Sequence, residues 1–289
     1  DEEIAQVLAV RDYAASEYLL LATRRGLVKK TELSLYDSPR QAGIIAVNFR
    51  DDDDELIGAD LCGSTDEILL ISTKGQAIRF PANDEELRPM GRATSGVTGM
   101  KFREGDELLS MSIIRTGESE EDRYVFTVTD GGFAKRTAVA EYRQQGRGGL
   151  GIKAMKLAED RGSIVGGVVV NEADEVIALK ASGQITRSPA SEVPVKGRDT
   201  MGVRFVGVRD GDSVVAIALY PEVTEEDVEA VEAAVEAETG EPDVVTKAAE
   251  SGVPVQVLEA EDSPAVHGGS ESAVPEEEST DPVDDDSID

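Results

Sequence analysis

Short apolar runs alternate with polar turns along residues 1–221, and the chain shows no helical spacing of apolar positions before Glu222. Runs such as "YLLLAT" and "YVFTVT" are rich in aliphatic, β-branched and aromatic residues, and turns containing Gly, Asp or Asn follow them. Side chains in a strand alternate between its two faces, so a short alternating run suits a half-buried strand. The pattern predicts an all-β body made of many short strands.

The strands belong to a unit that occurs four times. Each unit opens with a strand, a tight turn and a second strand: "YLLLATRRGLVKKT", "EILLISTKGQAIRF", "YVFTVTDGGFAKRT" and "EVIALKASGQITRS". The turn glycines are Gly26, Gly75, Gly132 and Gly183, and a base follows four residues later at Lys30, Arg79, Arg136 and Arg187.

The second half of each unit also repeats. A polar loop leads to an arginine, a glycine, an alternating strand, an acidic turn and a last apolar strand. The arginine–glycine pairs are Arg40–Gly43, Arg92–Gly96, Arg147–Gly151 and Arg198–Gly202. A period of about 50 residues with about four strands predicts β-propeller blades, at 12–62, 63–115, 120–170 and 171–221. Residues 4–10, "IAQVLAV", fit either the last strand of a preceding blade or a strand lent to the first.

Charge separates this body from the end of the chain. Residues 1–221 carry 28 Lys and Arg against 36 Asp and Glu, a net charge of −8. Residues 222–289 carry one Lys against 23 acids, a net charge of −22. A block of like charge with few aromatic residues cannot bury enough surface to order itself. We therefore expect an acidic, mostly disordered tail, with room for one short helix at 224–238.

Composition excludes several classes of protein. No apolar run is long enough for a membrane helix, and the start "DEEIAQ" is unlike a signal peptide, so we expect a cytoplasmic protein with no membrane partner. Cys62 lies in an apolar run and is expected to be a buried thiol. The single histidine, His267, lies in the acidic tail, and the chain has no nucleotide-binding fingerprint. We expect no catalytic residues, no metal site and no cofactor in this chain.

The repeated bases are the candidate binding groups. Equivalent residues of successive blades lie at equivalent positions around one rim, so two bases per unit predict a basic stripe that suits a polyanion. Glycines beside the arginines would expose backbone N–H groups to phosphate, although they could equally serve a bulge or a left-handed turn. The candidate DNA-binding residues are Lys30, Arg40, Arg79, Arg92, Arg136, Gln145, Arg147, Gly148, Gly149, Gly151, Arg187 and Arg198.

The stretches "LATRRGLVKK", "GIIAVNFRDDDDELIGADLC", "GGFAKRTAVAEY" and "QGRGGLGIK" resemble the C-terminal domain of the DNA gyrase A subunit in its actinobacterial form. The resemblance implies a β-pinwheel, a propeller variant whose blades exchange strands and whose basic rim wraps duplex DNA in the positive sense. It also implies partners for ATP-dependent negative supercoiling: the gyrase A cleavage core, which carries the nucleophilic tyrosine, and the gyrase B ATPase subunit, which uses ATP and Mg, in an A2B2 complex.

Two departures from the family pattern matter. The family usually has six blades, whereas this chain has four repeated units. Its Q-x-R-G-G-K-G box belongs to the first blade, whereas "QGRGGLG" resembles a second, box-like motif in which Leu150 replaces the lysine. A protein-interaction propeller with no nucleic-acid role is the alternative function. Phosphate contacts release counterions, so a linear loss of affinity with log salt distinguishes DNA binding from it.

Overall fold

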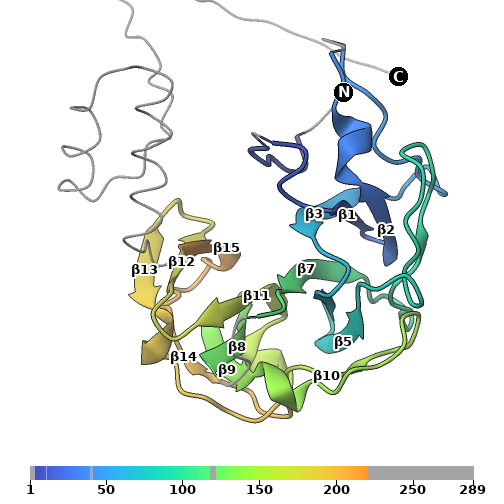
Figure 1. The fold of residues 1–289 in the computed structure, drawn as a ribbon. Helices are drawn as coiled ribbons and strands as arrows, with labels where there is room; N and C mark the ends of the chain where they lie inside the picture. The colour runs from blue at the N-terminus through green and yellow to red at the C-terminus, as the bar shows by residue number, and fades with distance from the viewer. Residues whose placement is uncertain (1–3, 11, 40–41, 118–121, 221–289) are drawn as a thin grey trace, which may run out of the picture. The chain divides into compact units, whose positions relative to one another are not determined.

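The computed structural model of the chain describes residues 4–10, 12–39, 42–117 and 122–220 (Figure 1). The chain divides into two compact parts, residues 1–223 and 224–289. The second part, with the acidic tail and the helix predicted at 224–238, lies outside the described residues. The described part folds into four antiparallel sheets, and its helices are short 3₁₀ turns. The prediction of an all-β protein with four blades is confirmed.

Each blade is one sheet, whose strands are named from the innermost outward. Blade 1 consists of β3 (Leu56–Cys62), β1 (Tyr18–Thr23), β2 (Leu27–Glu32) and β6 (Val97–Thr98). Blade 2 consists of β7 (Leu108–Ile114), β4 (Glu67–Ser72), β5 (Gln76–Pro81) and β10 (Ile152–Lys153). Blade 3 consists of β11 (Ile164–Asn171), β8 (Arg123–Thr129), β9 (Phe133–Ala138) and β14 (Val203–Arg204). Blade 4 consists of β15 (Val214–Tyr220), β12 (Glu175–Lys180) and β13 (Ile185–Pro189).

The outermost strand of blades 1–3 comes from a later unit of the chain. In blade 1, β6 pairs antiparallel with β2, with Leu27 opposite Thr98 and Val28 opposite Val97. The same two-residue pairing joins β10 to β5 and β14 to β9. The strand exchange implied by the family resemblance is therefore present, and we call β6, β10 and β14 the donated strands.

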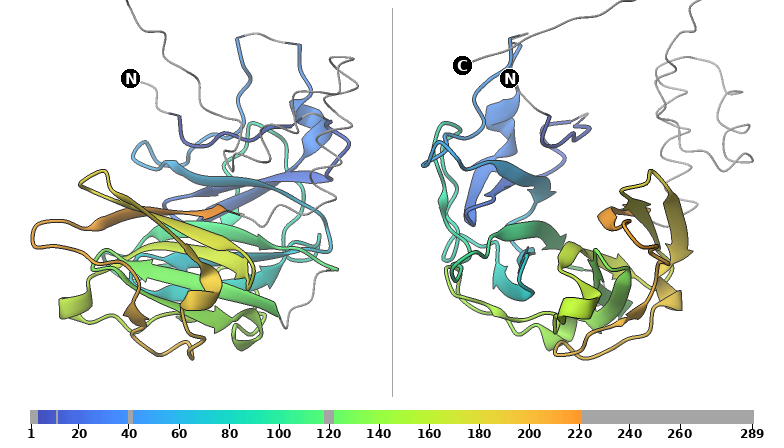
Figure 2. Two further views of the ribbon diagram at one scale, coloured as in Figure 1. Left: turned by 90° about the vertical axis from the view of Figure 1, so that its left-hand side faces the viewer. Right: turned by 180° about the vertical axis from the view of Figure 1, so that it is seen from behind.

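The innermost strands β3, β7, β11 and β15 lie side by side in chain order, each in contact with the next (Figures 1 and 2). Apolar side chains are buried between blades as well as within them. One core cluster joins Leu20 of blade 1 to Ile68 and Phe80 of blade 2. Burial of one such side chain contributes roughly 1.5–3 kcal/mol. No blade could bury both its faces alone, which is why neighbouring units must stack.

Short 3₁₀ helices follow three of the hairpins: η1 (Leu33–Tyr36), η3 (Val139–Glu141) and η5 (Ala190–Glu192). A fourth, η4 (Glu159–Arg161), precedes β11. Residues 4–10 form no strand, so they lend none to the first blade. Cys62 is buried at the end of β3, as predicted, and burial raises the pKa of its thiol to about 12.

Candidate nucleic-acid interface

The base after each hairpin turn is buried in blades 1–3. In blade 1 the Lys30 side chain has no exposed surface. Its Nζ donates to the Ala82 carbonyl at 2.6 Å and to Asp84 at 2.8 Å, both in the next unit. Nζ also lies 4.3 Å from the ring centre of Tyr18. Lys30 therefore joins blade 1 to unit 2.

Blades 2 and 3 repeat this arrangement with arginine. Arg79 donates to two carbonyls of unit 3, those of Val139 at 3.2 Å and Tyr142 at 3.3 Å. Arg136 donates to two carbonyls of unit 4, those of Val193 at 2.6 Å and Ser191 at 3.2 Å. Both guanidinium groups are buried. Arg187 of blade 4 is exposed, bound to Glu175 and stacked over Tyr220. The expectation of an exposed stripe is therefore wrong for Lys30, Arg79 and Arg136, which link adjacent blades.

The arginine that precedes the repeated glycine in the second half of each unit makes a different contact, which is the same in units 2, 3 and 4. Its NH1 donates to the carbonyl two residues after the repeated glycine of the preceding unit: Arg92 to Ile45 at 3.0 Å, Arg147 to Thr98 at 3.1 Å and Arg198 to Lys153 at 3.1 Å. Arg40, the equivalent residue of unit 1, lies outside the described residues. These arginines tie each outer loop to the donated strand of the preceding unit, or to its equivalent in unit 1.

The glycines of "QGRGGLG" allow one backbone to lie directly on another. Gly148 N–H donates to Gly99 O at 2.6 Å, and Lys101 N–H donates to Gly149 O at 2.9 Å. Gly151 has a φ of 71°, and a Cβ there would lie 2.5 Å from Ala77 O. Close packing therefore accounts for Gly151, and a φ of 76° accounts for Gly148.

Gln145 is placed by its backbone as well. Its N–H donates to Arg79 O at 2.7 Å, on the blade that the loop crosses. Contact of DNA with Gln145, Arg147 and the loop glycines stays a prediction.

Two buried lysines that were not among the sequence candidates hold the same loops. Lys135 Nζ donates to Gly197 O at 2.8 Å and to Arg198 O at 2.7 Å. Lys29 Nζ donates to the carbonyls of Ala46 and Arg92. Burial lowers the pKa of each lysine to about 8. The sequence feature that could have revealed them is a lysine within an otherwise apolar strand.

Comparison with known proteins identifies the family. A family described as "DNA gyrase C-terminal domain, beta-propeller" matches residues 17–62, 66–115, 123–171 and 181–221, which coincide with the four repeated units. The chain belongs to this family. This gyrase C-terminal domain is 56% identical over 254 residues to the DNA gyrase A subunit of a Nocardioides species, covering 78% of this chain and 28% of the relative. It is 58% identical over 230 residues to the same subunit of Streptomyces coelicolor, covering 78% and 26%.

Solved structures are similar over most of the domain. The C-terminal domain of a DNA topoisomerase IV matches with a TM-score of 0.72 at 25% identity, over 83% of this chain and 72% of that one. A DNA gyrase A C-terminal domain matches with a TM-score of 0.64 at 27% identity, over 73% and 68%. The chain spans about a quarter of the length of the gyrase A subunits that it matches.

Seven exposed bases of this gyrase C-terminal domain lie on the donated strands and their continuations, or on the equivalent segment of unit 1. The segments 44–50, 97–103, 152–158 and 203–209 contain no Asp or Glu. Their seven bases, which we call the rim bases, are all exposed: Arg50, Lys101, Arg103, Lys153, Lys156, Arg204 and Arg209. None was a sequence candidate, because the candidates were chosen at the base after the hairpin turn, at the arginine before the repeated glycine and in the Gly-rich loop. The sequence feature that could have revealed them is the absence of Asp and Glu from these four segments of an acidic chain.

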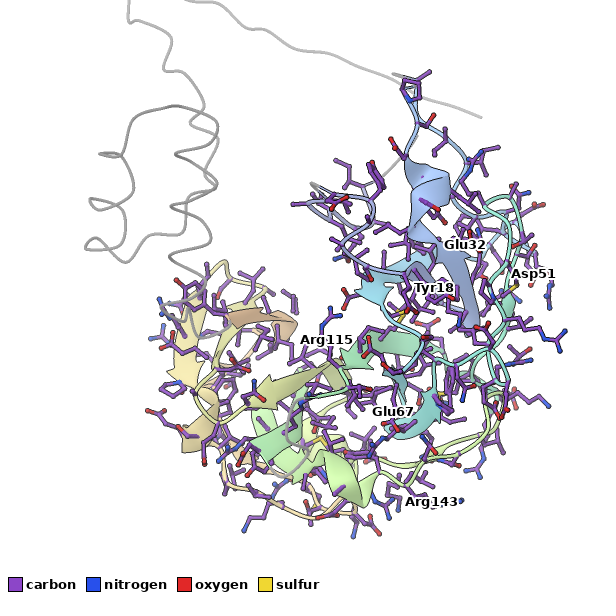
Figure 3. All side chains as sticks on the ribbon, in the orientation of Figure 1. Tyr18, Glu32, Asp51, Glu67, Arg115 and Arg143 are labelled. Carbon is purple, nitrogen blue, oxygen red and sulfur yellow. The ribbon has the colours of Figure 1, made fainter. Side chains whose placement is uncertain are left out.

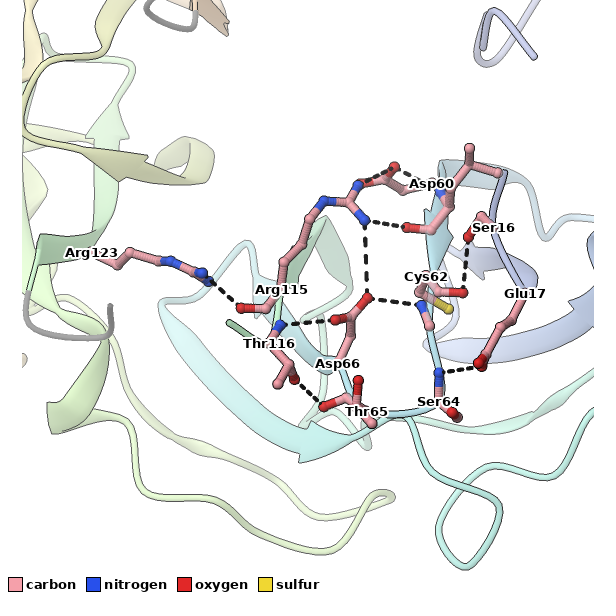
Figure 4. A network of polar contacts seen from close by, with 12 residues as sticks. Ser16, Glu17, Asp60, Cys62, Ser64, Thr65, Asp66, Arg115, Thr116 and Arg123 are labelled. Carbon is pink, nitrogen blue, oxygen red and sulfur yellow. Dashed lines mark hydrogen bonds and ion pairs between the residues drawn. The ribbon is translucent and has the colours of Figure 1, made fainter. Parts of the chain in front are cut away.

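Not every exposed arginine is on this rim. Arg115 lies on the inner side after the end of β7, whereas Arg143 lies on the outer side (Figure 3). Arg115 donates to Leu61 O at 3.2 Å and lies between Asp60 and Asp66, at 3.5 and 4.0 Å (Figure 4). Burial raises the pKa of Asp60. Arg115 therefore serves a network between blades 1 and 2, away from the rim.

Among the described residues, no group of His, Cys, Asp and Glu side chains is placed to hold a metal ion. No helix in that part of the chain is long and apolar enough to cross a membrane.

Proposed function

We propose that this chain binds duplex DNA along the rim bases, with little regard to sequence, and wraps it. The observation that carries the proposal is the placement of seven exposed bases on four acid-free segments of a body whose net charge is −8. Phosphate contacts of this kind position DNA without reading bases. Arg92, Arg147 and Arg198 support the same rim by holding its loops.

In the whole protein, the chain would act as the C-terminal part of a gyrase A subunit. It would work with the gyrase A cleavage core and the gyrase B ATPase subunit in an A2B2 complex in the cytoplasm. ATP and Mg would be used by the gyrase B partner, and the wrapped DNA would support negative supercoiling. Membership of the gyrase C-terminal domain family supports this proposal.

The first test is the salt dependence of binding to a mixed-sequence duplex, measured by fluorescence anisotropy. Each phosphate contact adds about 0.9 to the slope of log affinity against log salt on duplex DNA. Lys156→Gln removes an exposed rim base and should lower both the affinity and the slope. Arg115→Gln, which removes an exposed base on the inner side, is the control and should change them less. Equal effects of the two variants would contradict binding along the rim.

A gain of function tests the Gly-rich loop. Leu150 is 45% exposed at the place where the family box has lysine. Leu150→Lys should tighten binding and steepen the salt slope by about one unit. A slope equal to that of the unchanged chain would mean that DNA does not reach this loop.

Wrapping needs a topological measurement. Nicked circular DNA that is ligated in the presence of the chain should have a shifted linking number, in the positive sense expected of the family. Binding without any shift would support a protein that contacts DNA but does not wrap it. Binding that is insensitive to salt would favour the protein-interaction alternative.

A further inference from the structure

Blade 3 differs from the other blades in the turn before its innermost strand. In units 1, 2 and 4 an aspartate of this turn accepts a backbone N–H of the hairpin turn: Asp54 from Arg25 at 3.0 Å, Asp106 from Lys74 at 2.9 Å and Asp212 from Ser182 at 3.1 Å. In unit 3 the hairpin turn supplies the acid, and Asp130 Oδ1 accepts the N–H of Ser163 at 2.9 Å. Gly162 takes the place of the aspartate there, and a base, Arg161, comes before it.

Arg161 is held in place by the blade on which it lies. A Cβ at Gly131 would lie 2.6 Å from Arg161 O, so the backbone of Arg161 lies directly on the hairpin turn. Its Nη1 donates to Gly202 O at 3.2 Å, and its guanidinium carbon lies 4.5 Å from the ring centre of Phe133. A side chain that is already ordered loses little conformational entropy when it binds a ligand.

Arg204 lies over the same aromatic ring. Strand β14 pairs antiparallel with β9, and Arg204 is directly opposite Phe133 (Figure 1). Its guanidinium carbon lies 5.2 Å from the ring centre, so the two guanidinium groups are no farther apart than the sum of their distances from it. Arg204 is exposed and Arg161 is half-buried. Among the described residues, no other ring lies under two arginines.

Neither of these arginines has an acidic partner. In the part of the chain that the structure describes, no carboxylate lies within ion-pair distance of Arg161 or Arg204. The exposed Arg25, Arg115 and Arg187 are each paired with one. Two like charges over one ring repel each other, and an anion bound by both removes that repulsion. The planar guanidinium group suits the oxygens of a phosphate, which it can bind with two hydrogen bonds.

We propose that Arg161 and Arg204 together form a binding site for one phosphate group, and that its occupant is a phosphodiester of duplex DNA. We call these two residues the arginine pair. The proposal rests on the proposed binding of DNA along the rim bases, of which Arg204 is one, and it adds Arg161 to that surface. Blade 3 would then hold the duplex more tightly than a blade that offers single bases.

A double-mutant cycle on the full chain tests whether the arginine pair binds one phosphate. Duplex affinity is measured by fluorescence anisotropy for Arg161→Gln, for Arg204→Gln and for the double variant. Each single variant should weaken binding about tenfold and the double variant only about 20-fold, because either change removes most of the hold on a shared phosphate. Independent sites would give an additive loss of about 100-fold, which would overturn the proposal.

The salt dependence counts the phosphates that the arginine pair contacts. Each phosphate contact contributes about 0.9 to the slope of log affinity against log salt, so the double variant should lose about 0.9 rather than about 1.8. The control cycle combines Arg161→Gln with Lys101→Gln, which removes an exposed rim base of unit 2. These two changes should add in both affinity and slope. Equal coupling in the two cycles would contradict a local site.

Arg161 also bonds Gly202 O, so a purely structural role must be tested separately. Arg204 makes no side-chain hydrogen bond or ion pair among the described residues, and Arg204→Gln should leave the urea midpoint unchanged. Arg161→Lys keeps the charge but lacks the planar guanidinium group, so it should lose the coupling to Arg204. A lowered urea midpoint for Arg161→Gln, together with unchanged duplex affinity of Arg204→Gln, would show that Arg161 only supports the fold.

A free phosphate ion has the same chemistry as a phosphodiester, and a change of anion distinguishes the two. Sodium phosphate and sodium chloride at equal ionic strength should weaken duplex binding by the unchanged chain to the same degree. A larger loss in phosphate that disappears in the double variant would assign the site to free phosphate and overturn its assignment to DNA.

Failure of this proposal can be told apart from failure of the proposed function. Additive losses at Arg161 and Arg204, with Lys156→Gln still lowering the salt slope, would overturn the arginine pair alone. Binding of the unchanged chain that is insensitive to salt would overturn DNA binding along the rim bases, and the arginine pair with it.

Discussion

At the residue scale, the base that follows the hairpin turn is buried or exposed according to whether a later unit covers it. Arg136 is buried because unit 4 supplies carbonyl acceptors to it, and it also lies 4.8 Å from the Tyr124 ring centre. Arg187 is exposed because no later unit covers it in the described part of the chain. Position in the repeat therefore does not set the environment; the neighbouring unit does.

Arg136→Met should lower the free energy of unfolding by about 2–4 kcal/mol, because it leaves buried carbonyls without donors. Arg187→Met should cost less than about 1 kcal/mol, as expected for an exposed ion pair. Urea denaturation of the two variants measures both values. Equal losses of unfolding free energy would show that the hydrogen bonds from Arg136 to unit 4 do not stabilise the fold.

The buried lysines give a prediction of pH dependence. Because the folded pKa of Lys29 and Lys135 is lowered to about 8, the unfolded chain binds more protons than the folded chain above that pH. Stability from these two groups should therefore rise from about pH 8 to about pH 10, by at most about 1.4 kcal/mol per pH unit for each lysine.

The control is the double variant Lys29→Met, Lys135→Met, compared with the unchanged chain by urea denaturation across this range. Groups shared by both proteins cancel in the difference, which should grow with pH in favour of the unchanged chain. Parallel curves would mean that the ammonium groups keep an ordinary pKa, with the carbonyls compensating for burial.

At the element scale, the donated strand is the unit of blade assembly. Each is only two residues long, so pairing alone contributes little, and the close approach of backbones at the glycine before it is what fixes its place. Gly202 lies in such a contact, with a Cβ position 2.5 Å from Ala134 O. Gly43 has the same φ of 75° and no neighbour.

Gly43→Ala should therefore cost about 1–2 kcal/mol, the conformational penalty of a side chain at positive φ. Gly202→Ala carries the same penalty and must also move a backbone, which should add about 1–3 kcal/mol. The difference between the two unfolding free energies isolates the contact. A difference near zero would mean that blade 3 and unit 4 separate easily.

At the scale of the whole molecule, charge is the property that opposes the proposed function. The rim bases lie on a body of net charge −8, and residues 222–289 add a net −22. A tethered polyanion competes with DNA at a high effective concentration. Such competition is screened as the Debye length falls from about 30 Å at 0.01 M salt to about 8 Å at 0.15 M.

Truncation after Pro221 should therefore tighten duplex binding, with the larger gain at low salt. Replacing the tail by an uncharged Gly/Ser segment of equal length controls for its bulk and should give the same gain. Anisotropy titrations at two salt concentrations measure the effect. Truncation that leaves the low-salt affinity unchanged would show that the tail does not affect the rim.

The sequence by itself determined the all-β class, the four units, the hairpins and their turn glycines, because a period of two and a fixed repeat are local properties of the chain. The family resemblance was equally readable in the residues, and the family match confirms it. Tertiary structure decided which bases face solvent. Lys30 and Arg136 are buried by carbonyls some 50 residues away, on the next unit. It also decided that the glycines of "QGRGGLG" meet protein backbone, since close approach between distant segments leaves no signature beyond the glycine itself.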